Sequence, residues 1–127
     1  MKLWGKVKES VAGRPWQAPQ GVTIDQAGVP LGIPAGTILR ESDDAEYVWC
    51  NKVALEGLDA QLFYPVTIVN NGNRVSVIMA GRHVADVSPR ALPTAVEALR
   101  RTGGKQAPGM LEPGDANRKT SRILVRV

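Results

Sequence analysis

The sequence predicts a mainly β fold (β-rich α+β), namely a small antiparallel β-barrel or sandwich-like module with one short helix. This fold class follows from the turn residues, the apolar runs and a single helical pattern. Thirteen Gly and nine Pro among 127 residues predict many turns and few long helices. Two apolar runs flank an Asn-Gly pair in mid-chain, which is typical of a β-hairpin. Only one segment has a clear apolar stripe at helical spacing.

The middle of the chain gives the clearest prediction, an antiparallel three-stranded meander over residues 62–87. We expect Asn71-Gly72 to form a two-residue type I′ turn, because Asn-Gly tolerates positive φ at both positions. In that register Ile68 faces Val75. The apolar face then consists of Tyr64, Val66, Ile68, Val75, Val77 and Met79. The opposite face is mixed and is expected to be solvated, and Ala80-Gly81 is predicted to turn the chain into the third strand.

A helix and a closing strand complete the predicted elements. We expect the helix over about residues 89–102, where Arg100-Arg101 suit the last turn and Gly103-Gly104 end it. Its apolar stripe consists of Leu92, Ala95, Val96 and Leu99. A strand is predicted over about residues 121–127, where basic and apolar residues alternate.

Length and charge predict one domain with a basic arm. A chain of 127 residues has the usual size of a single domain. Residues 1–20 carry four basic side chains and one acidic side chain, and we expect them to form an N-terminal arm. Residues 21–127 are predicted to form one β-rich domain. Residues 21–81 are acidic and residues 82–127 are basic, so the basic ends would share one face if they meet; otherwise the charge serves solubility.

The cysteine count and the apolar runs predict a cytoplasmic protein. The single cysteine, Cys50, excludes an internal disulfide. The sequence has no run of about 18 apolar residues, which a membrane-spanning helix needs. Charges also interrupt every apolar run after the basic N-terminus, so no secretory signal is expected. We therefore expect no membrane partner.

The residues that carry chemistry are too few or too scattered to predict an enzyme. One His and one Cys cannot build a Cys/His zinc site. His83 would have to be the base of every Ser or Cys nucleophile scheme, and its place near a turn favours a surface or half-buried strand histidine. No phosphate-cradling loop motif is present. We predict a non-enzymatic binding module with no catalytic residue, no metal and no cofactor. An enzyme with a carboxylate pair is the remaining alternative, because such pairs leave no sequence pattern.

Basic and aromatic side chains favour nucleic-acid binding, with a single strand as the expected ligand. Small β-barrels bind single strands in basic grooves where aromatic side chains stack on bases. The predicted binding residues are Arg74, Arg82, His83, Arg118, Lys119 and Arg122. Trp49 and Tyr64 are candidate stacking residues, although both also fit a core. The alternative is a protein-interaction or assembly module, such as a phage or mobile-element accessory protein, that binds a protein partner or itself.

The order of features over residues 62–99 resembles the HIRAN domain. Val75-Ser76-Val77-Ile78 is similar to the valine-rich strand of that family, and Gly81-Arg82-His83-Val84 to its turn and return strand. Ser88-Pro89-Arg90-Ala91 is similar to the start of its helix. Asn70-Asn71-Gly72-Asn73 departs from the acidic, Asn- and Pro-containing stretch of the family. The resemblance implies a small β-barrel-like domain that recognises DNA, including single-stranded ends.

Overall fold

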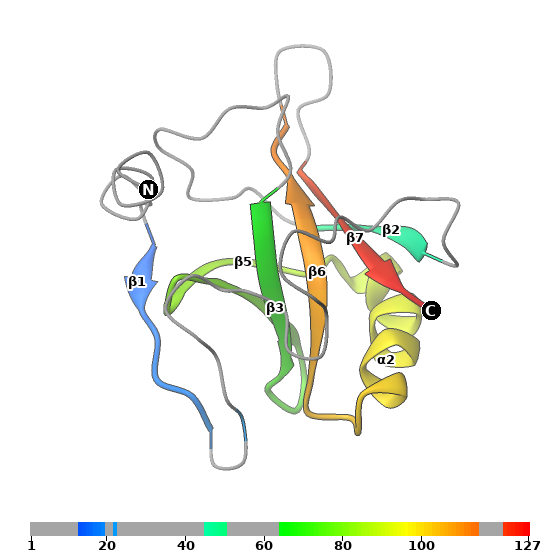
Figure 1. Cartoon of the computed structure of the whole chain (residues 1–127), viewed down its shortest axis with the longest axis horizontal. Coiled ribbons are helices and arrows are strands. Elements are labelled where there is room, and N and C mark those ends of the chain that lie inside the picture. Colours follow the sequence, from blue (N-terminus) through cyan, green and yellow to red (C-terminus); the bar gives the residue numbers. More distant parts are fainter. Residues whose placement is uncertain (1–12, 20–21, 23–44, 51–63, 115–120) are drawn as a thin grey trace.

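The computed structural model describes residues 13–19, 22, 45–50, 64–114 and 121–127. These residues form one antiparallel sheet with the strand order β1-β5-β4-β3-β6-β7-β2 and one α-helix (Figure 1). The elements are β1 (Arg14–Pro15), β2 (Ala45–Trp49), β3 (Tyr64–Asn70), β4 (Val75–Met79), β5 (Arg82–Asp86), the 3-10 helix η1 (Pro89–Ala91), α2 (Leu92–Arg101), β6 (Gln106–Glu112) and β7 (Arg122–Arg126). The predicted mainly β fold with one short helix is confirmed.

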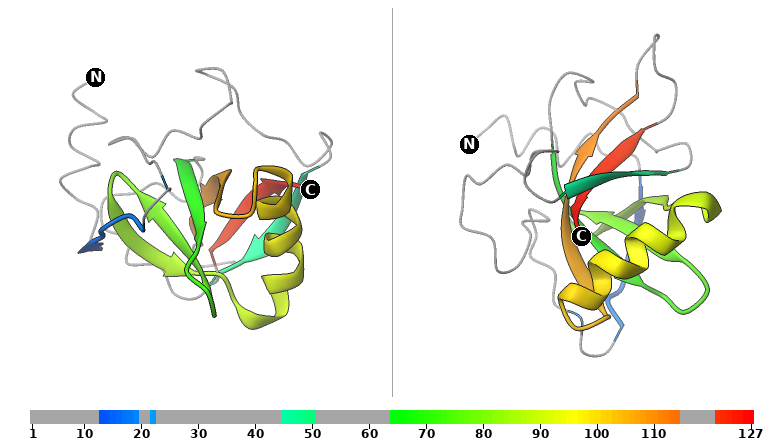
Figure 2. Two further views of the ribbon diagram at one scale, coloured as in Figure 1. Left: turned by 90° about the horizontal axis from the view of Figure 1, so that it is seen from below. Right: turned by 90° about the vertical axis from the view of Figure 1, so that its right-hand side faces the viewer.

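The sheet curls but does not close. Cys50, just after β2, makes an isolated antiparallel bridge with Val87, just after β5. The backbone N–H of Ser88 donates to the carbonyl oxygen of Trp49 at 2.8 Å. Within the described part of the chain, one bridge joins the two sides of the sheet, so the predicted barrel or sandwich describes the shape only loosely. Helix α2 packs along one side of the curled sheet (Figure 2), and none of the described helices is long and apolar enough to cross a membrane.

The β3–β4 hairpin has the predicted faces but a different register. Ile68 pairs with Val77, and Asn70 pairs with Val75, so the loop has four residues instead of two. The Asn70 side chain accepts a hydrogen bond from the N–H of Gly72 at 2.9 Å, and this side-chain contact stabilises the wider loop. The shift is two residues, and side chains alternate along a strand. The apolar face therefore keeps its predicted residues, all in the core: Tyr64, Val66, Ile68, Val75, Val77 and Met79.

The type I′ geometry expected at Asn71-Gly72 occurs instead at the next turn, between β4 and β5. Met79 pairs with Arg82, and the residues between them both have positive φ, 53° for Ala80 and 76° for Gly81. Left-handed backbone is unfavourable for Ala by about 1–2 kcal/mol because of its Cβ atom. The turn at Ala80-Gly81 was predicted. Its backbone is strained at Ala80, and a substitution at that position can relieve the strain.

Ala80→Asn is expected to raise the free energy of unfolding by about 1 kcal/mol, because Asn tolerates the left-handed region better than Ala. Urea denaturation of the variant and the parent protein measures the difference. Gly81→Ala is the matched control and is expected to lower stability by about 1 kcal/mol, since it adds a Cβ atom at positive φ. A destabilised Ala80→Asn variant would contradict the turn geometry.

Helix α2 faces the sheet with a stripe rotated from the predicted one. Ala95, Ala98 and Leu99 are buried, whereas Val96 is 50% exposed. The prediction that Val96 belongs to the apolar stripe is therefore wrong. The small side chains of Ala95 and Ala98 allow close packing on the sheet, which explains why they, and not Val96, face it.

The sheet face opposite the core is buried at its centre. Thr67 is 1% exposed, Ser76 is 2% exposed, and Val69 and Ile78 are 0% exposed. The prediction of a solvated face is wrong there. Accessible polar groups on this face are found instead toward the edge of the sheet that β5 and β1 form.

Candidate functional site

A bulge in β5 brings two titratable side chains to one face. Val77 pairs with Ala85 and the next residue of β4, Ile78, pairs with His83, so Val84 is the extra residue. Residues three apart in a regular strand point to opposite faces, and the extra residue removes that alternation. Consequently His83 Nε2 lies 2.7 Å from Asp86 Oδ1.

Asp86 is the centre of a polar network on this face. The Ser76 hydroxyl donates to Asp86 Oδ1 at 3.3 Å, and the Asn71 side-chain amide donates to Ser76 Oγ at 2.6 Å. The Arg74 guanidinium lies 3.5 Å from Asp86 Oδ2. The network therefore joins the hairpin loop, β4 and β5 into one polar surface.

The same contacts set the ionisation of Asp86. Partial burial raises the pKa of this carboxyl, but the hydrogen bonds from His83 and Ser76, with the charges of His83 and Arg74, outweigh burial and lower the pKa below its usual value of 3.8. The ionised carboxylate of Asp86 therefore contributes its full stabilisation at pH values above the usual pKa of 3.8. As pH falls through the lower pKa of the folded state, this stabilisation is lost.

Asp86→Asn is expected to lower the free energy of unfolding by about 1 kcal/mol at pH 7, because three side chains lose a charged partner. The deficit should shrink as pH falls below 3.8, where the parent protein also loses the carboxylate. Thermal unfolding of both proteins between pH 7 and pH 2.5 measures it. A deficit that is constant over this range would contradict the role of the charge.

Strand β1 forms a wall beside this network. Arg14 pairs with His83, and Pro15 with Arg82. The N–H of Trp16 donates to the carbonyl oxygen of Gly81 at 3.0 Å, and Arg82 Nη1 donates to the carbonyl oxygen of Gly13 at 2.9 Å. A Cβ atom on Gly13 would lie 2.6 Å from the carbonyl oxygen of His83, so only glycine permits this close approach.

Between β1 and the β3–β4 hairpin lies an open groove of about 440 Å³. Its lining comes from three segments: Arg14, Pro15 and Trp16 of the β1 segment, Asn71 and Arg74 of the loop, and Ser76 and His83 of the sheet. Among the residues that the structure describes, the groove gathers two guanidiniums, an imidazole and an indole.

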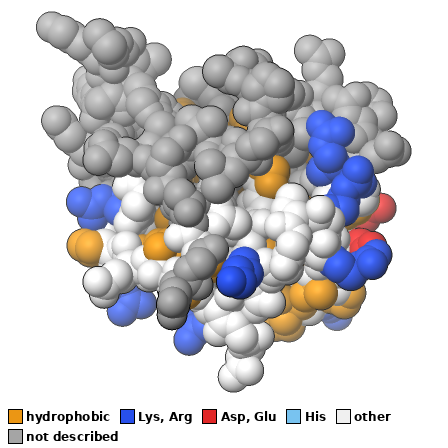
Figure 3. Space-filling model, turned by 60° about the horizontal axis from the view of Figure 1, so that its bottom comes forward, with side chains coloured by type: hydrophobic (Ala, Val, Ile, Leu, Met, Phe, Trp, Pro, Cys, Tyr) orange, Lys and Arg blue, Asp and Glu red, His pale blue; other side chains and the backbone are white. Residues whose placement is uncertain are grey.

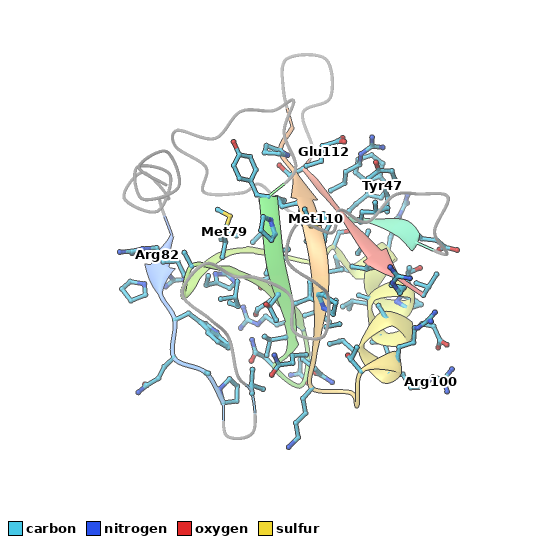
Figure 4. The ribbon with its side chains drawn as sticks, viewed as in Figure 1. Tyr47, Met79, Arg82, Arg100, Met110 and Glu112 are labelled. Carbon is cyan, nitrogen blue, oxygen red and sulfur yellow. The ribbon has the colours of Figure 1, made fainter. Side chains whose placement is uncertain are left out.

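The structure brings together only part of the predicted binding set. Arg74 and His83 line the groove. Arg82 instead donates a hydrogen bond to the backbone of Gly13, just before β1 (Figure 4). Arg118 and Lys119 lie outside the described residues. Tyr64 is 6% exposed in the core, so the prediction that it stacks on bases is wrong: its position in β3 points it inward.

Arg122 lies at the opposite side of the sheet, in β7. Its Nε donates to Glu112 Oε1 at 2.8 Å, and its guanidinium carbon lies 3.7 Å from the centroid of the Tyr47 ring and 5.8 Å from that of Trp49. Trp49 is 41% exposed. Arg122 and Trp49 therefore form a second surface, remote from the groove in strand order.

Arg14, Trp16 and Asn71 are groove residues that sequence reasoning missed. The signal in the sequence was the polar and aromatic content of residues 14–16, but their pairing with β5 spans about seventy residues. Asn71 was interpreted as a turn former only.

The described residues of the groove do not place a hydroxyl group against the imidazole. Asp86 lies between Ser76 and His83, so the hydroxyl donates to a carboxylate and not to the imidazole that would have to remove its proton. No cluster of three metal-ligating side chains occurs in the described part of the chain. The resemblance to the HIRAN domain stays a prediction, since no family model, no curated protein and no solved structure matches this chain.

Proposed function

We propose that this protein is a nucleic-acid-binding module that holds a single strand, with DNA the expected ligand, in the groove between β1 and the β3–β4 hairpin. The observation that carries the proposal is the convergence of Arg14, Arg74 and His83 with Trp16 around one open groove. Single-strand binding requires cations along the phosphates and an aromatic surface for the bases. The groove supplies both from segments far apart in sequence.

The charge of the described residues supports this ligand. They include nine Lys and Arg but four Asp and Glu. Three of those acids already have cationic partners: Asp86 with Arg74, Glu97 with Arg100, and Glu112 with Arg122. Cationic side chains are spread over the surface in Figure 3. Such an excess attracts polyanions over a distance set by salt.

The size of the groove fits a short stretch of strand. A volume of about 440 Å³ lies within the range of small-molecule sites, roughly 300–1,000 Å³. The groove is not an enclosed cavity. Stacking of one base on an aromatic side chain contributes about 1–3 kcal/mol, and Trp16 is the aromatic residue placed for it.

The test is fluorescence polarisation of a labelled oligothymidine at two salt concentrations. Arg14→Ala/Arg74→Ala is expected to weaken binding by at least about tenfold and to reduce the slope of log K against log salt by about 1.4, because each phosphate contact with a single strand contributes about 0.7. Arg90→Ala/Lys105→Ala removes the same charge from exposed positions outside the groove and should retain most of the affinity. Absence of binding at low salt would overturn the proposal.

A second candidate function, protein interaction or assembly, rests on the surface around Trp49. Trp, Tyr and Arg are the residues most enriched at interface hot spots, and Trp49, Tyr47 and Arg122 contribute one of each at the β2 end of the sheet. Size-exclusion chromatography with light scattering tests self-association. A dimer that Trp49→Ala abolishes would support this function, and a monomer at all concentrations would exclude self-assembly.

A further inference from the structure

We propose that His83, Arg14 and Arg74 form a subsite for one phosphate group of the bound strand, and that this subsite takes the phosphate only when His83 carries a proton. The inference rests on the proposed function, since it names the part of the strand that the groove binds and the condition for binding. It follows from the way Asp86 occupies one nitrogen of the imidazole.

Asp86 fixes the tautomer of neutral His83. An ionised carboxylate only accepts hydrogen bonds, and Asp86 Oδ1 lies 2.7 Å from His83 Nε2. Nε2 must therefore carry the hydrogen, which leaves Nδ1 as a bare acceptor in the neutral ring. A phosphate oxygen is also an acceptor, so neutral His83 has no donor at Nδ1 with which to bind it. Protonation adds an N–H at Nδ1, the nitrogen with no partner among the described residues.

The charged groups around His83 favour an anion once the ring is protonated. Arg14 of β1 is the direct strand partner of His83, and Arg74 lines the same groove from the hairpin loop. Asp86 of β5 is the acidic group facing the ring, and Ser76 of β4 is neutral. Arg82, the residue before His83 in β5, donates a hydrogen bond to the carbonyl oxygen of Gly13. An incoming phosphate would therefore meet three cations, one of which depends on pH.

A purely structural His83, which only holds the bulge through Asp86, would make a different prediction for binding. It would leave the affinity for DNA unchanged between pH 8.0 and 5.5, because the fold would present the same two arginines. The proposed subsite instead requires tighter binding at the lower pH. His83 is the single histidine in the chain, so a change over this range can be assigned to one side chain.

The experiment measures oligothymidine binding by fluorescence polarisation at pH 5.5 and pH 8.0 and constant ionic strength. Thymine has no group that titrates in this range. We expect about tenfold tighter binding at pH 5.5 and a salt slope more negative by about 0.7, the contribution of one further cation. His83→Gln keeps a side-chain donor for Asp86 but does not titrate, so its affinity should be equal at both pH values. Arg90→Ala should keep the parent ratio.

The proton NMR signal of His83 gives a second readout without any substitution. Because coupling between two ligands is reciprocal, a tenfold effect of the proton on DNA affinity means that DNA raises the titration midpoint of His83 by about one pH unit. Equal affinity at both pH values with an unshifted midpoint overturns the subsite and leaves the proposed function intact. Absence of binding at both pH values overturns the function itself, and pH dependence that persists in His83→Gln overturns the assignment to His83.

Discussion

Replacing Leu99 by Ala is expected to lower the free energy of unfolding by about 3 kcal/mol. Leu99 is 1% exposed and belongs to the core cluster between α2 and the sheet. Truncation removes buried methyl groups and leaves a cavity that the neighbouring side chains fill only in part. A urea titration monitored by far-UV circular dichroism measures the loss, and the slope of the transition shows whether unfolding remains two-state.

Val96→Ala on the same helix is the control. Val96 is 50% exposed, so its truncation should change stability by less than about 0.5 kcal/mol. The helix propensity of Ala further favours the variant. Equal losses at positions 96 and 99 would contradict the orientation of α2, because they would mean that both side chains face the sheet.

The helix also shows how far periodicity determines a fold. Its position and its end were predictable from Leu92, Leu99 and Gly103-Gly104. A rotation of the helix by some tens of degrees about its axis changes which side chains are buried. The spacing of apolar residues does not fix this rotation, so it could not tell whether Val96 or Ala98 faces the sheet. Packing against the sheet determines which side of α2 is buried, because the small side chain of Ala98 allows a close approach.

The β3–β4 hairpin gives the corresponding lesson for strands. Alternation correctly assigned the β3 and β4 residues of the core cluster, since a shift of two residues preserves the faces, but it did not predict that Val69 and Ile78 on the other face are buried. The register itself depended on Asn70 accepting a hydrogen bond from Gly72, a local choice that competes with the two-residue turn. Asn-Gly in the sequence favours both loops.

The candidate site was the least predictable part of the molecule. Arg74 and His83 follow from their charge and their place near turns. The bulge at Val84 and the pairing of Arg14 with His83 have no local signal, because each is a contact with another strand. Asp86 was therefore not recognised as the centre of a network, and Trp16 was not recognised as a wall of the groove.

Gly13→Ala is expected to abolish most DNA binding while it leaves the core folded. The new Cβ atom would lie 2.6 Å from the backbone carbonyl oxygen of His83 and 3.2 Å from Val84 Cγ1, so β1 must move away from β5. Arg14 and Trp16 then leave the groove together. We expect an affinity loss of at least about tenfold, as for removal of the groove cations, and a stability loss of about 1 kcal/mol, because β1 contributes few of the stabilising contacts.

Gly103→Ala is the control, because it makes the same replacement of Gly by Ala and is expected to lower stability by a similar amount. Gly103 has a φ of 97° with open space around its Cα, so Ala there costs about 1 kcal/mol through backbone strain without touching the groove. Polarisation assays should then separate two variants of similar stability, with binding lost at position 13 and kept at position 103. If both bind like the parent protein, β1 is not a wall of the binding site. Arg74 and His83 would then have to bind DNA without Trp16, and the exposed ring of Trp49 would become the stronger candidate for contact with a partner.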